Sequence, residues 1–246
     1  MPKRDIVFSK PFMNAAGILG FAPDGPAPVR WADLGAFITN PVSLRPRKPA
    51  AAPELLEFAG GFLLHTGLPN PGLHATIRKF GRRWNEAALP IIVHLMADRP
   101  EETKQMVQTL EGLENVMAVE LGFAPLLAGD IILLAVEMSR GELPLIVSLP
   151  SEQILDLGGR LLEAGVAALS LASPRGAISK DGNLVSGRLF GPSLLPKSLD
   201  TVNSAARLGF PIIGAGGVCS ETDAQAMLAA GAMAVQLDCS LWLPVE

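Results

Sequence analysis

The sequence contains only two cysteines, Cys219 and Cys239, among its 246 residues. They form no Cys-x-x-Cys pair, and no ladder of cysteines and histidines accompanies them. A disulfide framework and a zinc site are therefore both unexpected, and we expect the cysteines to behave as small buried hydrophobic residues. No group of carboxylates and histidines occurs at metal-ligand spacing either, so we expect no bound metal ion.

Long apolar runs and basic runs are also absent. The first residues, MPKRDIVFSK, are charged and lack the apolar core of a signal peptide. The longest apolar stretch, around Ile131 to Val136, is far too short to span a bilayer. A net charge of −4 and an isoelectric point near 5.5 do not favour a nucleic-acid partner. We therefore expect a cytoplasmic protein with neither a nucleic-acid nor a membrane partner.

Short apolar runs recur along the whole chain. Hydrophobic residues make up 49% and charged residues 18% of the sequence, which is typical of a well-cored globular protein, and the length suits a single domain over residues 1–246. Continuous runs rich in Val, Ile and Leu indicate strands that are buried on both faces. These runs lie at Phe12–Ala15, Ala36–Thr39, Ile91–Leu95, Ala118–Leu121, Leu145–Leu149, Ala168–Leu171, Ile212–Ile213 and Ala234–Leu237.

Amphipathic stretches separate these runs and predict helices. They cover Pro71–Trp84, Pro100–Leu113, Leu126–Arg140, Ser151–Ala164, Ser193–Leu208 and Ser220–Ala230. Several open with helix-start chemistry, such as the capping-box spacing of Ser220 and Asp223. Repeated strand–helix units imply a parallel sheet, and about eight strands favour a (β/α)₈ TIM barrel. The alternative is an open doubly wound sheet, but the first strand is followed by Asn14-Ala-Ala-Gly17 and not by a GxGxxG turn.

The barrel is expected to lack its last helix. Only Asp238 to Glu246 follow the eighth predicted strand, and no helix fits there. Apolar surface left uncovered on the outside of a barrel usually marks an interface, so a second copy or another protein partner is one interpretation. A chain that was cut short is the other.

The strongest local signal for a ligand is the loop Gly214-Ala-Gly-Gly217 after the seventh strand. Glycines allow close backbone approach, and the free amides at the start of a helix attract anions. In barrels the loops after the last two strands commonly bind phosphate. A tight strand–helix turn without a ligand is the structural alternative.

Several motifs resemble landmarks of the dihydroorotate dehydrogenase family, in the same order and spacing from about Asp5 to Leu241. They are Pro11-Phe-Met-Asn-Ala-Ala-Gly17, Ser43-Leu-Arg-Pro-Arg-Lys48, Gly67-Leu-Pro-Asn70, Gly187-Arg-Leu-Phe-Gly-Pro192, Pro211-Ile-Ile-Gly-Ala-Gly-Gly217 and Ala230-Gly-Ala-Met-Ala-Val-Gln236. The resemblance implies a (β/α)₈ barrel that holds FMN at the carboxyl ends of its strands and oxidises dihydroorotate to orotate in pyrimidine metabolism.

The resemblance also implies a set of cofactor-binding residues. Ala15, Ala16 and Gly17 would lie along the flavin, and Gly191, Gly216 and Gly217 would face its phosphate. Three further cofactor positions are occupied by other side chains than the family's: Asn40 and Ser148 replace lysines, and Cys239 replaces a threonine.

Other side chains that the family uses for chemistry are also replaced. Leu64 stands where the family has a substrate asparagine, Gly122-Phe-Ala-Pro-Leu126 replaces the loop that carries the base in one class, and Ser170-Leu-Ala-Ser-Pro174 replaces an asparagine cluster. Asp238 replaces a glycine beside the expected phosphate, where like charges repel unless the carboxylate turns away or a cation such as Arg188 neutralises it.

The remaining candidates are histidines and asparagines. His94 ends the third strand and could act as an acid or base in the barrel mouth, although we prefer to interpret it as a hydrogen-bonded buried histidine. We interpret His65 as a loop residue, His74 as a solvated helix residue, and Asn14 and Asn70 as residues that organise loops.

Three functions follow. The first is an FMN-dependent oxidoreductase of this family that is not active on dihydroorotate itself. The second is a non-catalytic family member that serves as a subunit or scaffold, as a homo-oligomer or with another protein. The third is a barrel that binds a smaller phosphate ester.

Overall fold

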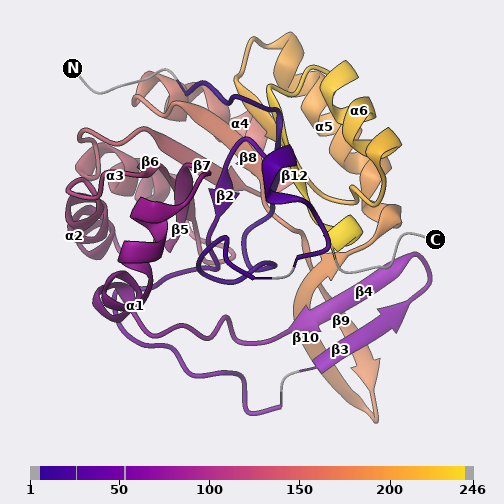
Figure 1. Ribbon diagram of the computed structural model, residues 1–246. Coiled ribbons are helices and arrows are strands. Elements are labelled where there is room, and N and C mark those ends of the chain that lie inside the picture. The colour runs from indigo at the N-terminus through magenta and orange to yellow at the C-terminus, as the bar shows by residue number, and fades with distance from the viewer. Residues whose placement is uncertain (1–5, 26, 53, 242–246) are drawn as a thin grey trace.

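Eight parallel strands form the centre of the computed structural model, which describes residues 6–25, 27–52 and 54–241 (Figure 1). All eight predicted strands are present. Their bounds are β1 Phe12–Asn14, β2 Phe37–Ile38, β5 Ile91–Met96, β6 Val116–Gly122, β7 Leu145–Leu149, β8 Ala168–Leu171, β11 Ile212–Gly214 and β12 Ala234–Leu237. They are hydrogen-bonded in the order β1-β12-β11-β8-β7-β6-β5-β2. The predicted TIM-barrel fold is confirmed.

The barrel closes between β1 and β2, which have only three and two residues. A single bridge joins Met13 to Ala36, so the ordinary ladder contributes little here. The buried side chain of Asn14 supplies the missing bonds, because its Nδ2 donates to the carbonyl of Ile38 at 2.7 Å and its Oδ1 accepts from the amide of Ile38 at 3.0 Å. Asn14 therefore organises backbone, as predicted.

Six α-helices surround the barrel in the part of the chain that the structure describes (Figure 1). They are α1 Leu73–Glu86, α2 Pro100–Leu110, α3 Gly129–Met138, α4 Ser151–Glu163, α5 Leu195–Arg207 and α6 Glu221–Ala229. The predicted cap of α6 is present, since Ser220 Oγ accepts from the amide of Asp223 at 3.2 Å. None of these described helices is long and apolar enough to cross a membrane.

Two turns of the barrel have no α-helix among the described residues. Between β1 and β2 only the 3₁₀ turn Trp31–Asp33 forms, and Trp84 of α1 donates to the carbonyl of Phe21 at 2.6 Å to hold that loop. After β12 the 3₁₀ turn Cys239–Leu241 follows, and the rest of the predicted helix-free terminus lies outside the described residues.

A second, antiparallel sheet of four strands lies beside the barrel, and the sequence patterns did not predict it (Figure 1). It contains β3 Glu54–Phe58, β4 Gly61–His65, β9 Arg175–Lys180 and β10 Asn183–Phe190, in the order β3-β4-β10-β9. His65 is therefore a strand residue, and its prediction as a loop residue is wrong. The missed signal was Asp181-Gly182, a two-residue hairpin turn in which both residues have positive φ.

The interior of the barrel is layered. The inward-facing residues near the lower ends of the strands are apolar and fully buried, and they include Met13, Ile38, Ile92, Ile146 and Ile213. A larger apolar cluster lies between the strands and the helices. Because side chains alternate along a strand, the next inward-facing residue lies two positions further on, at the mouth of the barrel.

Candidate active site at the barrel mouth

The uppermost inward-facing layer is polar. It consists of His94 on β5, Glu120 on β6, Ser148 on β7, Ser170 on β8 and Gln236 on β12, all buried. Each residue follows an apolar inward residue by two positions, so the strands place all five near the carboxyl ends of the barrel. The layer separates the apolar core from the space above it and forms a polar floor at the carboxyl ends of the strands.

Glu120 is the centre of this polar floor. Its side chain is 1% exposed, and its oxygens accept from His94 Nδ1 at 2.6 Å, Ser170 Oγ at 2.7 Å and Gln236 Nε2 at 2.6 Å. Burial alone would raise the pKa of Glu120, but the bonds from His94, Ser170 and Gln236 outweigh it and hold the pKa below its ordinary value. A carboxylate is therefore stable here.

The carboxylate of Glu120 fixes the ring of His94. Since the carboxylate only accepts, Nδ1 of His94 must carry the proton, and Nε2 of a neutral ring then presents a lone pair. Nε2 lies against Gly122, where any side chain would collide with it. No described residue pairs with Nε2, and His94 lines the cavity above the floor. The structure thus gives His94 the arrangement of a general base or hydrogen-bond acceptor.

The cavity above the floor has a volume of about 400 Å³ and is hereafter the floor cavity. Of the predicted cofactor residues, Ala15, Ala16, Ser148 and Gly216 line it. Gly17 and Asn40 line an adjoining cavity of about 280 Å³, together with Ala16. The structure does not place Gly191, Gly217 or Cys239 in either lining.

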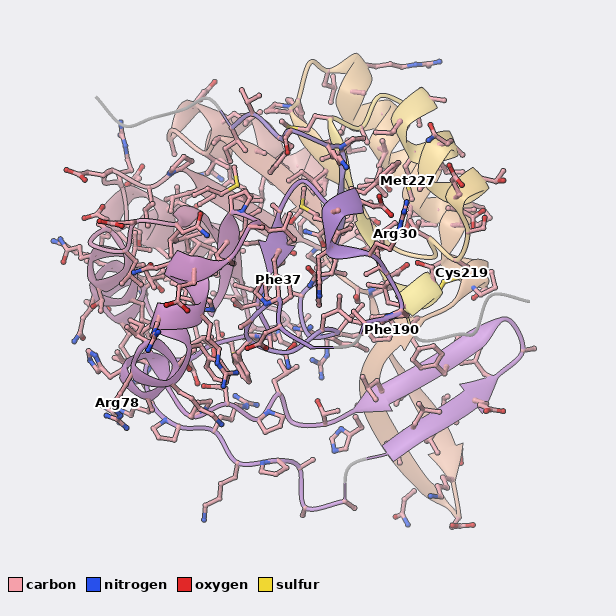
Figure 2. The ribbon with its side chains drawn as sticks, viewed as in Figure 1. Arg30, Phe37, Arg78, Phe190, Cys219 and Met227 are labelled. Carbon is pink, nitrogen blue, oxygen red and sulfur yellow. A yellow bond between two sulfur atoms is a disulfide. The ribbon has the colours of Figure 1, made fainter. Side chains whose placement is uncertain are left out.

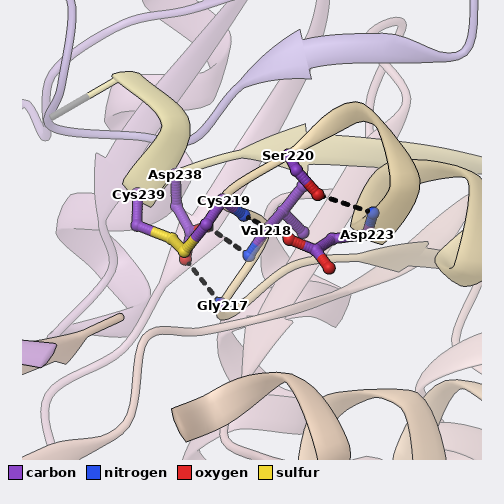
Figure 3. The surroundings of a disulfide bond; sticks show 7 residues. All are labelled: Gly217, Val218, Cys219, Ser220, Asp223, Asp238 and Cys239. Carbon is purple, nitrogen blue, oxygen red and sulfur yellow. Dashed lines mark hydrogen bonds between the residues drawn. A yellow bond between two sulfur atoms is a disulfide. The ribbon is translucent and has the colours of Figure 1, made fainter. Parts of the chain in front are cut away.

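The glycine-rich loop after β11 is filled by a carboxyl group of the chain itself (Figure 3). Asp238 Oδ2 accepts from the amide of Gly217 at 2.9 Å, and Asp238 Oδ1 accepts from the amide of Val218 at 2.8 Å. Asp238 is 1% exposed. Burial raises the pKa of Asp238, and these amide bonds oppose the rise. The carboxyl group does not turn away from the loop and forms no ion pair with Arg188, although both residues line the floor cavity.

A disulfide bond closes the same corner, and the expectation of unpaired cysteines is wrong. Cys219 follows Val218 in the loop, Cys239 follows Asp238, and the two sulfurs are bonded with Cα atoms 4.8 Å apart (Figure 3). The bond links the ends of β11 and β12, which are neighbours in the sheet. Sequence spacing did not reveal this pairing, because only the barrel brings the two strand ends together.

The glycines of this region are required by packing. Gly191 has a φ of 133°, and a Cβ there would lie 2.4 Å from Gly61 Cα; Gly217 has a φ of 82°, and a Cβ there would lie 2.5 Å from the Leu195 amide nitrogen. Close backbone approach therefore accounts for both positions without a phosphate. Since both amides at the turn already bind Asp238, the residues present do not fit a flavin phosphate in this loop.

Two asparagines hold the rim of the mouth. Asn70, which was predicted to organise a loop, accepts through Oδ1 from the amides of Ser43 and Gly72. Asn40, which was predicted as a cofactor position, accepts through Oδ1 from the amide of Gly20. His74 is exposed on α1. Among the described residues no group of three or more His, Cys, Asp or Glu could hold a metal ion.

A closed parallel barrel with a polar floor and a cavity at the carboxyl ends of its strands defines the class of protein: an α/β barrel with its ligand site at the mouth. A family model described as dihydroorotate dehydrogenase matches residues 4–125. The chain is 30% identical over 251 residues to the dihydroorotate dehydrogenase B (NAD(+)), catalytic subunit, of Pelobacter propionicus, covering 92% of this chain and 82% of that protein.

The corresponding protein of Trichlorobacter lovleyi is 28% identical, with 92% of this chain and 82% of the relative covered. A crystal structure of DHODH from Eimeria tenella in complex with ferulenol superposes with a TM-score of 0.76 at 17% identity, covering 96% of this chain and 78% of the other. The chain belongs to the dihydroorotate dehydrogenase family.

The buried carboxylate of Glu120 yields a prediction on stability. Glu120→Gln leaves one of three donors without an acceptor, so we expect a loss of about 2–4 kcal/mol in the free energy of unfolding at neutral pH. Because the folded-state pKa is lowered, this stabilisation is present above the unfolded pKa of about 4.3 and is lost as the pH falls through the folded pKa. The difference from wild type should therefore shrink in acid.

Urea unfolding at several pH values measures both effects. Glu114→Gln is the matched control, because Glu114 is exposed and the same charge is removed. Equal stability of Glu120→Gln and wild type at neutral pH would contradict the network.

The disulfide yields a second prediction. Cys219 and Cys239 are 20 residues apart in sequence, and a cross-link over such a loop typically stabilises by about 2–4 kcal/mol. We expect the double variant Cys219→Ser/Cys239→Ser to lose that amount in guanidinium unfolding, and reductant to lower the stability of wild type alone. Alkylation of two thiols in unreduced, unfolded protein would contradict the bond.

Proposed function

We propose that this family member binds a small organic ligand at its barrel mouth without FMN and does not oxidise dihydroorotate. One observation carries the proposal: the amides of Gly217 and Val218 both donate to Asp238, a group of the chain itself. A phosphate could enter only by displacing a buried carboxyl group. In this interpretation the chain keeps the family's barrel, and the side chain of Asp238 occupies the place of the phosphate.

The replaced side chains support the same proposal. Asn40 and Ser148 stand at the positions where the resemblance leads us to expect lysines. Asn40 organises the Gly20 loop, and Ser148 forms part of the floor. Leu64 lies opposite Arg188 in the antiparallel sheet. In place of those groups the mouth offers His94, held by Glu120, as its one predicted acid–base candidate. Proton transfer or ligand positioning by His94 is the chemistry that these residues allow.

The alternative is a non-catalytic subunit. Two of the relatives are named as catalytic subunits, a term that implies further subunits. Two exposed leucines support a surface that a partner covers: Leu126 at the mouth is 100% exposed and Leu184 on β10 is 76% exposed. A homo-oligomer or a complex with another protein would bury them. The single-domain organisation and the cytoplasmic location stay predictions.

Flavin binding tests the proposal. We expect purified wild type to be colourless and to ignore added FMN, whereas Asp238→Gly/Cys239→Thr frees both amides and gains FMN affinity of at least about tenfold, as charge-assisted bonds to a phosphate provide. Fluorescence quenching measures binding. Riboflavin, which lacks the phosphate, should not gain affinity.

Cys239→Thr alone is the matched control, because it breaks the disulfide and keeps the carboxyl group. Neither variant should turn over dihydroorotate. A yellow wild-type protein with flavin absorbance bands, or dihydroorotate oxidation by wild type, would overturn the proposal.

Light scattering after size exclusion tests the alternative. A subunit would run above its monomer mass of 25.9 kDa, alone or with a partner, and Leu126→Ser/Leu184→Ser would shift it towards the monomer because the covered apolar area shrinks. His74→Ser, an exposed change on α1, serves as the control. A strict monomer at high concentration would count against self-association.

A further inference from the structure

Two arginines face each other across the antiparallel sheet at the barrel mouth. Arg175 on β9 and Arg188 on β10 are paired in register, and like charges directly opposite each other destabilise a sheet. Neither forms an ion pair with any residue in the described part of the chain. An anion that lies between or beside the two guanidinium groups would relieve this repulsion.

The cavity next to these arginines is strongly basic. It has a volume of about 280 Å³, and its lining includes Arg47, His65, Arg175 and Arg188 but no acidic residue among those described. We refer to it as the arginine cavity. Arg47 Nε donates to the carbonyl of Gly67 at 2.5 Å, and His65 Nδ1 contacts the carbonyl of Ser186 at 2.8 Å. These bonds fix both side chains in place.

The electrostatics of Arg188 agree with this geometry. Burial and then the charge of Arg175 lower the pKa of Arg188 to about 10, and the charge of Glu120 opposes them. Arg188 nevertheless remains protonated at neutral pH. Two buried carboxyl groups, those of Glu120 and Asp238, line the floor cavity together with Arg188. Glu120 already accepts from His94, Ser170 and Gln236, and Asp238 accepts from two loop amides, so the oxygens of both are engaged elsewhere.

The arginine cavity adjoins the floor cavity. Ala16, Arg175 and Arg188 belong to both linings. The floor cavity combines apolar walls, which include Phe123, Pro125 and Leu171, with the polar floor that contains His94. Glu120, Glu152 and Asp238 also belong to its lining. The joined space therefore has a cationic end and an end where apolar walls surround hydrogen-bonding groups.

We propose that the arginine cavity binds the anionic head, a carboxylate or a phosphate, of an organic ligand whose body lies in the floor cavity against His94. The inference deepens the proposed function and rests on it, since the ligand takes the mouth that FMN does not occupy. Paired guanidinium forks bind both head groups through two parallel hydrogen bonds. The anion would also relieve the repulsion between Arg175 and Arg188.

The experiment uses three fluorescent probes with one body: naphthoate, naphthyl phosphate and the neutral naphthamide. Purified wild type is first checked for flavin absorbance: a yellow protein overturns the proposed function and this inference with it, whereas a colourless protein without a preference for the anions overturns this inference alone. We expect at least one anion to bind at least about tenfold more tightly than naphthamide. Binding should weaken with added salt, since the contact is electrostatic. The stronger of the two anions identifies the head group.

Arg188→Gln should abolish the preference for the anion, and Arg188→Lys should retain part of it by keeping the charge without the planar fork. Arg78→Gln is the matched control. Arg78 is exposed on α1, well away from the β9–β10 hairpin (Figure 2). If Arg188→Gln fails to fold, Arg175→Gln takes its place. Equal affinity of wild type for naphthamide and both anions, or an unchanged preference in a folded Arg188→Gln, would overturn the inference.

Discussion

The arrangement of the side chains at the barrel mouth depends on the buried carboxylate of Glu120. A charge buried at 1% exposure is stable only when its oxygens are fully hydrogen-bonded. Its donors come from β5, β8 and β12, so the barrel must hold three strands in register with β6 around one side chain. The same bonds fix the proton of His94 on Nδ1. Apolar residues could fill such a layer with equal stability, so stability alone gives no reason to keep a charge there.

The carboxyl group of Asp238, at the rim of the barrel, is likewise buried and hydrogen-bonded. Two successive amides in the loop before α6 can bind an anion, and here they bind a carboxyl group of the chain itself. The disulfide between Cys219 and Cys239 joins the residues next to these partners and reduces the freedom of the carboxyl group to leave. A glycine-rich loop can therefore persist after its ligand is replaced, because Gly217 is also required by its contact with Leu195.

The sequence predicted the barrel well because strands buried on both faces, such as Leu145–Leu149, are apolar at all but one position. The hairpins were missed since residues such as Leu55 and Leu184 are exposed and their strands show no such run. Within the site, the sequence singled out His94, Asp238 and Gly217, but neither Glu120 as the partner of His94 nor the bond from Gly217 to Asp238. Glu120, Ser170 and Gln236 were visible as polar residues in apolar strands, two positions after a core residue. The disulfide and the direction of the Asp238 side chain depend on tertiary contacts that spacing does not encode.

The acidic and the basic side chains at the mouth differ in whether the protein supplies their partners. The buried acidic groups, Glu120 and Asp238, both accept hydrogen bonds from the protein, whereas Arg175 and Arg188 find no acidic partner among the described residues. The chain as a whole carries a net charge of −4, so this local excess of positive charge is not a property of its composition. Folding stability favours pairing such cations or removing them. Local violations of that rule concentrate where a protein binds something, and in this barrel the violation lies at the mouth, where the fold places its ligands.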